Sequence, residues 1–266
     1  LDKTRIFIST LSSINGKQEL FNLKKFDVAI IDEASQILEP QLMGVLSKVD
    51  KFILIGDHNQ LATIVLQNEF SSAIEEQELR DIGVYDCRIS FFERLLQTCK
   101  KNQWKEAYVQ LKDQGRMHVD ISAFPAKFFY EENLFPIMDW QKDSLKLTDS
   151  NHGVMDSWVA NNRVLFLSTE KLKEVNTSNK INYNEANTIA ALVQSILRVY
   201  KESNSTLNTS QIGIIAPYRN QIALIKQQLA EAKIANYEEI SVDTVERYQG
   251  SQRDLILLSF CVNRPY

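Results

Sequence analysis

Two adjacent carboxylates stand directly after a run of four apolar residues, in the stretch VAIIDEASQ at residues 28–36. The apolar run is typical of a buried strand, so Asp32 and Glu33 are expected where that strand ends. One carboxylate there could hold a hydrated Mg²⁺ on the phosphates of a nucleotide, while its neighbour polarises an attacking water. The alternative is that the pair only supplies negative charge near the N-terminus of the next helix, where acidic side chains are favourable.

Two further stretches place phosphate-binding residue types after predicted strands. In LIGDHNQL, residues 54–61, Gln60 can offer an amide to a phosphate oxygen or a water, although Gly, Asp and Asn are also common in an ordinary turn. In QGRMHVDI, residues 114–121, Arg116 supplies a planar guanidinium that suits phosphate oxygens. The alternative is that Arg116 is merely exposed and that His118 is a half-buried polar residue.

Composition restricts the classes of protein that the chain can belong to. The 266 residues are 44% hydrophobic and 24% charged, which is typical of a folded globular protein. The net charge of −4 requires that any nucleic-acid contact come from a local groove. The cysteines Cys87, Cys99 and Cys261 are scattered, so they predict neither disulfides nor a zinc site, and a reducing cytosolic setting fits best. No apolar run approaches the length that spans a membrane.

Short apolar runs alternate with stretches of helical period, which predicts a doubly wound α/β fold built on parallel sheets. A helix is predicted at residues 185–200, with Asn182 as its cap. Polar stretches at residues 138–153 and 201–210 are predicted to be surface loops. The strands are predicted at residues 5–9, 28–31, 52–55, 107–111, 164–167, 212–216, 240–242 and 255–260.

A polar patch at residues 100–104 follows the predicted helix at residues 89–101 and marks the expected domain junction. We therefore expect one domain at residues 1–103 and a second at residues 104–266. Since the chain opens at Leu1, it is expected to be part of a longer protein.

The motifs STLSS, DEASQ, GDHNQL, QGRMH, APYRNQ and VDTVERYQGSQRD follow one another in this order along the chain. Their order and spacing resemble those of superfamily 1 helicases, and specifically the subset that contains the nonsense-mediated-decay helicase and its DNA-processing relatives. The resemblance spans nearly the whole chain. It implies two RecA-like domains of the P-loop NTPase type, with ATP and Mg²⁺ as cofactors. It also implies a partner, single-stranded DNA or RNA, and an intracellular location, cytoplasmic or, in a eukaryote, nuclear.

The resemblance also implies roles for individual residues. By their motif positions, Asp32 is the Mg²⁺ ligand, Glu33 the catalytic base, Gln60 the γ-phosphate sensor and Arg116 an arginine that reaches the nucleotide from the second domain. The nucleotide-binding positions are Gln114, Gly250 and Gln252. The positions expected near the nucleic-acid backbone are Thr10, Pro217, Tyr218 and Thr244.

The sequence departs from the pattern of this family at several points. It contains no G-x-x-x-x-G-K-[ST] phosphate loop, and the last arginine motif is also missing, so we expect this chain by itself not to hydrolyse ATP. Within the motifs, Ala62 and Thr63 replace a usual pair of prolines, Gln252 a usual glutamate, and Gly115 a usual tyrosine. These departures leave open a second class, a motor-derived nucleic-acid-binding scaffold that has lost turnover. A plain nucleotide-binding domain is a third.

Gly115 generates a prediction about base preference. A base stacked on an aromatic ring is worth about 1 to 3 kcal/mol, and glycine offers no ring. The complete protein that contains this chain should therefore bind nucleotides mainly through their phosphates, and GTP should support turnover nearly as well as ATP. Comparison of kcat/KM for ATP and GTP, in the parent and in Gly115→Tyr, checks this. A strong ATP preference in the parent that the tyrosine leaves unchanged would contradict it.

Overall fold

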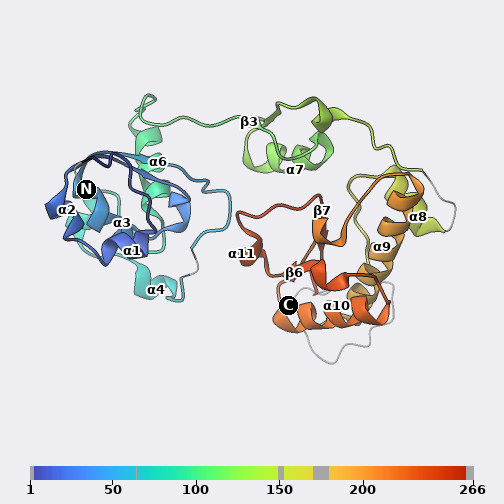
Figure 1. The fold of residues 1–266 in the computed structure, drawn as a ribbon. Coiled ribbons are helices and arrows are strands. Elements are labelled where there is room, and N and C mark those ends of the chain that lie inside the picture. The colour runs from blue at the N-terminus through green and yellow to red at the C-terminus, as the bar shows by residue number, and fades with distance from the viewer. Residues whose placement is uncertain (1–2, 64, 149–152, 170–179, 262–266) are drawn as a thin grey trace. The chain divides into compact units, whose positions relative to one another are not determined.

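The computed structural model describes the chain except for residues 1–2, 64, 149–152, 170–179 and 262–266 (Figure 1). It divides into two compact units, Leu1–Leu111 and Lys112–Tyr266. The functional boundary expected between residues 103 and 104 stays a prediction. No helix among the described residues combines the length and the apolar character needed to cross a membrane.

The first unit is built around two parallel strands, β1 (Phe26–Ile31) and β2 (Val49–Leu54). Their register pairs Ala29 with Phe52 and Ile31 with Leu54, so both strands end at the same edge. The connecting segment holds the 3₁₀ helix η1 (Ala34–Gln36) and the helix α3 (Glu39–Leu46). The remaining helices are α1 (Leu11–Asn15), α2 (Leu20–Leu23), α4 (Glu69–Ser72), α5 (Gln77–Asp81) and α6 (Phe91–Lys101).

An ion pair joins α6 to α3 in this unit. The Arg94 guanidinium binds both carboxylate oxygens of Glu39, with Nε to Oε2 at 2.8 Å, and it also donates to the carbonyl of Ile82 at 2.8 Å. Both charged side chains are mostly buried, and a fork that meets a carboxylate in this way fixes orientation as well as distance. The α6 helix begins at the cap Ser90, whose hydroxyl accepts from the Glu93 amide.

The second unit contains a three-stranded parallel sheet in the order β6 (Ser241–Asp243), β5 (Ile212–Ile215), β7 (Leu255–Leu258). The helix α10 (Arg219–Glu231) lies between β5 and β6 in the chain, and α11 (Val245–Tyr248) lies between β6 and β7. The chain thus passes from the central strand to one edge of the sheet and then to the opposite edge. The predicted parallel α/β architecture of the RecA-like type is therefore confirmed. The other elements are β3 (Asp113–Gln114), α7 (Val119–Phe129), β4 (Phe135–Pro136), η2 (Asp139–Lys142), α8 (Val154–Asn161), α9 (Tyr183–Glu202), η3 (Thr209–Gln211) and η4 (Tyr237–Glu239).

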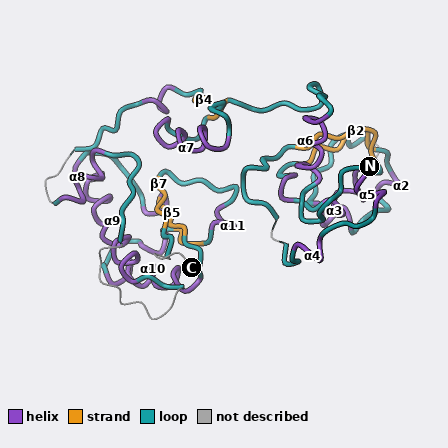
Figure 2. Tube along the Cα trace, turned by 180° about the vertical axis from the view of Figure 1, so that it is seen from behind, coloured by secondary structure: helices purple, strands orange, loops and turns teal. Residues whose placement is uncertain are grey.

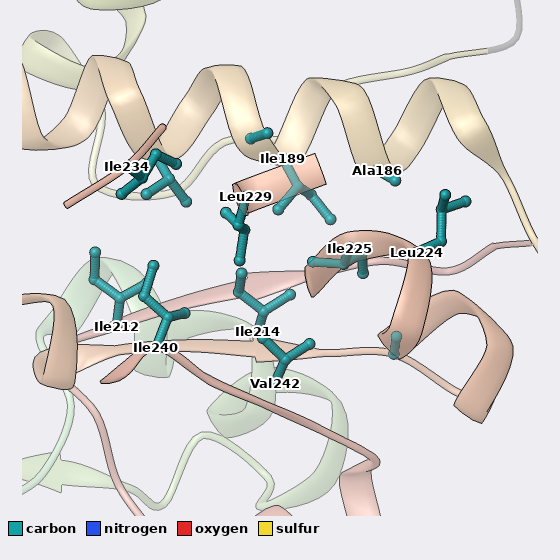
Figure 3. Close-up of a cluster of buried hydrophobic side chains, with 13 residues drawn as sticks. Ala186, Ile189, Ile212, Ile214, Leu224, Ile225, Leu229, Ile234, Ile240 and Val242 are labelled. Atoms are coloured by element: carbon teal, nitrogen blue, oxygen red, sulfur yellow. The ribbon is translucent and has the colours of Figure 1, made fainter. Parts of the chain in front are cut away.

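The core of the second unit lies between its long helices and its strands. Ile189 of α9, Ile225 of α10 and Ile214 of β5 are among the buried side chains that fill this space (Figure 3). The predicted cap of α9 is confirmed, because the Asn182 side chain accepts from the Glu185 amide at 3.0 Å.

A second buried cluster joins α8 to α9, which lie side by side (Figure 2). Within this contact Asp156 is 1% exposed, and its carboxylate accepts from Arg198 Nε and Nη2, both at 2.7 Å, and from the Ser195 hydroxyl. A buried carboxylate is tolerated only when its oxygens are paired in this way. The pairing therefore fixes where α8 sits on α9.

Some sequence-based expectations for secondary structure were wrong. Residues 5–9, 107–111 and 164–167 form no strand, because none of these apolar runs has a strand partner among the described residues. The predicted surface loop at 138–153 begins instead with the helix η2, in which Gln141 is completely buried.

Gly213 of the central strand generates a prediction about stability. A Cβ at this position would lie 2.7 Å from Tyr248 Oη, 2.8 Å from Ile256 Cδ1 and 3.0 Å from Arg253 Cγ. Gly213→Ala should therefore overpack the sheet and lower the free energy of unfolding by about 1 to 3 kcal/mol. Urea unfolding measures this, with Gly115→Ala as the control, because a Cβ there would meet Ile137 only at 3.5 Å. Equal midpoints for the two variants would contradict the prediction.

Candidate nucleotide site

Backbone hydrogen bonds continue past the ends of β1 and β2 and join the turns that follow them. The amide of Ile55 donates to the carbonyl of Ile31, and the amide of Ala34 donates to the carbonyl of Ile55, both at 2.8 Å. The turn with the acidic pair is therefore held against the turn that follows β2.

The contact between the two turns is close because Gly56 has no side chain. A Cβ on Gly56 would lie 2.9 Å from the Ser35 backbone nitrogen, so a larger residue would push the turns apart. Ser35 is buried, and its hydroxyl accepts from the Asp57 amide at 3.2 Å. Ser35 was not predicted to matter, although it lies inside the quoted motif DEASQ.

The acidic pair has a defined local geometry. Glu33 has a φ of 53°, in the left-handed region that non-glycine residues adopt only when their surroundings require it. Asp32 Oδ1 accepts from the Glu33 amide at 3.0 Å, and both side chains are exposed. The turn therefore presents both carboxylates to solvent at the end of the strand.

Gln60 lies on the second turn, and its own side chain is held there. Its Nε2 donates to Asp57 Oδ2 at 2.9 Å, while Asp57 Oδ1 accepts from the Asn59 amide at 3.0 Å. The structure thus places Asp32, Glu33 and Gln60 on two turns that are hydrogen-bonded to each other.

The residues at this edge suit a metal ion that arrives with a nucleotide. The described residues contain no cluster of three or more His, Cys, Asp or Glu side chains that could enclose a metal ion. Mg²⁺ bound to a nucleotide needs only one or two carboxylates, because phosphate oxygens and waters complete its shell. Asp32 fits, because its Oδ2 makes no hydrogen bond or ion pair with a described residue.

Arg116 of the second unit lies on a loop that a buried glutamine holds. Gln141 Nε2 donates to the carbonyls of Gln114, at 3.1 Å, and Met117, at 2.6 Å. Its Oε1 accepts from the amides of Ile137 and Met138 at 3.0 and 2.8 Å. Sequence reasoning missed Gln141, because a glutamine in a polar stretch gives no signal of burial.

The side chains around Arg116 differ in whether their hydrogen-bonding groups are already engaged within the loop. Arg116 is exposed, and its guanidinium makes no hydrogen bond or ion pair with a described residue. Gln114, by contrast, uses its Oε1 to accept from the amides of Arg116 and Met117 at 3.0 and 2.7 Å, and its Nε2 to donate to the Met117 carbonyl. His118 is 5% exposed and caps α7 by accepting from the Asp120 amide at 3.1 Å. Gln114 thus organises the loop that presents Arg116.

The positions expected near nucleic acid lie at the starts of helices. Pro217 is exposed and Tyr218 half-buried where α10 begins, and Thr244 stands immediately before α11. The Thr244 hydroxyl is hydrogen-bonded to the Glu246 carboxylate, which lowers the pKa of Glu246. In the first unit, Thr10 is exposed and caps α1 by accepting from the Ser13 amide at 3.3 Å.

Gly250 and Gln252 lie on the exposed segment between α11 and β7. Gly250 has a φ of 76°, and nothing lies within 4 Å of the place where a Cβ would stand. The Gln252 carbonyl accepts from Arg253 Nη1 at 2.7 Å. Tyr248, at the end of α11, is buried and donates to the Ser241 carbonyl at 2.5 Å, so the segment is anchored on the sheet at one end.

A polar network at the carboxyl ends of β5 and β7 was not predicted. Gln221 is fully buried, and its amide bonds both the backbone amide and the carbonyl of Asn182, at 2.7 and 3.1 Å, and Ser259 Oγ at 3.1 Å. Ser259 in turn donates to Glu185 Oε2 at 2.6 Å, and the Cys261 amide donates to the same oxygen at 2.8 Å. Burial and the Glu185 carboxylate raise the pKa of the Cys261 thiol to about 11.

Two protein-family models match the chain, and both are described as AAA domain. One covers residues 87–264 and the other residues 1–68, so the two together take in all six motifs quoted above. The chain belongs to the superfamily 1 helicases. The closer relation to the nonsense-mediated-decay helicase stays a prediction.

Curated proteins similar to this superfamily 1 chain carry helicase names. The DNA replication ATP-dependent helicase/nuclease DNA2 of Xenopus laevis is 33% identical over 91% of the chain and 22% of its own length. The human protein of the same name is 32% identical over 96% of the chain and 23% of its own length. The DNA polymerase alpha-associated DNA helicase A of Schizosaccharomyces pombe is 29% identical over 96% of the chain and 35% of its own length. The chain thus spans about a fifth to a third of the length of these relatives.

The Gln141 amide generates a prediction about the loop of Arg116. Gln141→Leu keeps a similar volume but leaves the carbonyls of Gln114 and Met117 and two backbone amides without this partner. Since each buried polar group that loses its partner costs about 1 to 3 kcal/mol, and water can reach part of this loop, we expect about 2 to 4 kcal/mol less stability. Urea unfolding measures the change.

The matched control for this prediction is Gln227→Leu on α10. The Gln227 side chain is exposed and its amide bonds a carboxylate, Glu231 Oε1, at 2.7 Å. This variant should unfold at nearly the parent midpoint. A parent-like midpoint for Gln141→Leu as well would show that its hydrogen bonds do not stabilise the loop.

Proposed function

We propose that the complete protein containing this chain is an ATP-dependent helicase that moves on single-stranded DNA. The observation that carries the proposal is the pair of hydrogen-bonded turns after β1 and β2, which set the exposed Asp32 and Glu33 beside the turn of Gln60. Family membership supports the same reaction. The relatives' names favour DNA over RNA.

The first unit would supply most of the hydrolytic chemistry. Asp32 would hold Mg²⁺, whose charge offsets that of the phosphates. Glu33 would accept the proton of the attacking water, since its carboxylate is exposed at the same strand end. The Gln60 amide would turn from Asp57 toward the γ-phosphate or the water, a small movement for an exposed side chain.

The second unit also carries residues that are suited to bind a nucleotide. Arg116 has a free guanidinium on a loop held by Gln114 and Gln141, so it is suited to bind the oxygens of a phosphate. Gly250 and Gln252 lie on an exposed segment whose backbone could reach the nucleotide, as the family resemblance implies. For Gln114 we propose the role of organising the Arg116 loop, in addition to the nucleotide contact implied by the resemblance.

Nucleic acid would bind through a few local contacts. The net charge of −4 gives no bulk attraction to a polyanion. The candidate residues Thr10, Pro217, Tyr218 and Thr244 lie at helix starts and are exposed or half-buried. Contacts of this kind go to phosphates and stacked bases, which carry little information about the identity of the strand.

Glu33→Gln in the complete protein tests the proposal. The substitution removes the base but preserves volume, so DNA-stimulated turnover should fall by about 100-fold or more, while ATP affinity stays nearly unchanged. The measurements are steady-state hydrolysis with single-stranded DNA and equilibrium binding of a fluorescent ATP analogue. Glu93→Gln on α6, a glutamate that takes no part in the proposed chemistry and whose carboxylate accepts from Gln97 Nε2, is the control and should hydrolyse ATP like the parent.

The outcomes separate the proposed function from its rivals. Turnover by Glu33→Gln equal to that of the parent would reassign the base. An absence of turnover in the parent itself, with retained strand binding, would favour a scaffold that has lost catalysis. Stronger stimulation by single-stranded RNA than by DNA of the same sequence would overturn the choice of DNA.

A further inference from the structure

Gln36 is in direct contact with the proposed base. Its Nε2 donates to Glu33 Oε2 at 2.7 Å, and its backbone amide donates to the Glu33 carbonyl at 3.0 Å. Gln36 itself is partly buried, whereas Glu33 is exposed. A partly buried amide thus holds one carboxylate oxygen of an exposed side chain.

This contact restricts the conformations that the Glu33 side chain can adopt. An exposed glutamate samples many rotamers, and each one places the carboxylate differently, so a general base needs something to hold it. A hydrogen bond from a neutral amide to a carboxylate is strengthened by the charge and transfers no proton. The hydrogen bond therefore fixes the position of the Glu33 carboxylate. The carboxylate, and not the Gln36 amide, keeps the lone pair that accepts a proton.

We propose that Gln36 is a positioning residue for Glu33, an inference that rests on the proposed role of Glu33 as the base. Gln36 occupies Oε2, and Oε1 makes no hydrogen bond or ion pair with a described residue. In the reaction, the Oε1 lone pair takes the proton of the attacking water, and the Gln36 amide keeps its own protons throughout.

Thr63 anchors Gln36 to the turn after β2. The Thr63 hydroxyl donates to the Gln36 carbonyl, which links the acidic turn to the segment that follows Gln60. Thr63 is one of the two residues that stand where the family usually has prolines, and a proline has no hydroxyl to donate. This departure from the family pattern therefore adds a hydrogen bond to Gln36, the residue that positions the base.

The decisive test compares Gln36→Met with Glu33→Gln and with the double variant in the complete protein. Methionine has a similar length but cannot donate a hydrogen bond, so kcat for DNA-stimulated hydrolysis should fall about tenfold or more, with KM for ATP within about twofold. In the Glu33→Gln background, Gln36→Met should cause no further loss, because there is no carboxylate left to position.

Controls come from α6, where side chains that take no part in the proposed chemistry make the same kinds of contact. Gln97 Nε2 donates to Glu93 Oε1 at 3.1 Å, and the Thr98 hydroxyl donates to the Arg94 carbonyl at 2.9 Å. Gln97→Met and Thr98→Val should keep parent kcat, whereas Thr63→Val should lower kcat in the same direction as Gln36→Met. Urea midpoints of the site variants close to the parent value show that the losses are not due to unfolding.

A crystal structure of Gln36→Met supplies a readout independent of turnover. The Glu33 carboxylate should leave the position that it has in the parent, in which Oε2 lies 2.7 Å from the amide. Three results would overturn the inference while leaving Glu33 as the base: an unchanged kcat in Gln36→Met, additive losses in the double variant, or an unmoved carboxylate in the crystal. Parent-like turnover by Glu33→Gln would instead remove the proposed function itself.

Discussion

The candidate site depends on the parallel pairing of β1 with β2. Because the strands end in register, the backbone bonds Ile55 to Ile31 and Ala34 to Ile55 extend the pairing into the two turns. The close approach of Gly56 to Ser35 then brings the turns into contact. An exposed acidic side chain packs against little, so the place of its residue in the fold comes from the backbone beneath it, and here that backbone belongs to a sheet.

Glutamine side chains hold the loops of the second unit. Gln141 and Gln221 are fully buried. Gln141 satisfies backbone groups of two segments, at residues 114–117 and 137–138, and Gln221 satisfies the backbone of Asn182 and the hydroxyl of Ser259. An amide suits this task because it donates and accepts at once, and because it is neutral its burial costs less than that of a charged group. The loop of Arg116 is thereby fixed while the arginine itself stays free to bind an anion.

The departures from the family pattern have different structural consequences. Thr63 supplies a hydroxyl that bonds Gln36, so a new contact accompanies the lost proline. Gly115 lies near Ile137 with room for a Cβ, so crowding at the Cβ does not account for the glycine. A change inside a motif can therefore be judged only from the contacts that surround it.

The sequence by itself determined the parallel α/β class, the helix capped by Asn182 and the order of the motifs, because strand and helix periods and capping residues act locally. It also placed Asp32 and Glu33 at a strand end. It wrongly predicted strands at residues 5–9, 107–111 and 164–167, since a strand exists only through a partner that an apolar run does not specify. The burial of Gln141 and Gln221 and the link from Thr63 through Gln36 to Glu33 were decided by tertiary structure, because each joins segments that only folding brings together.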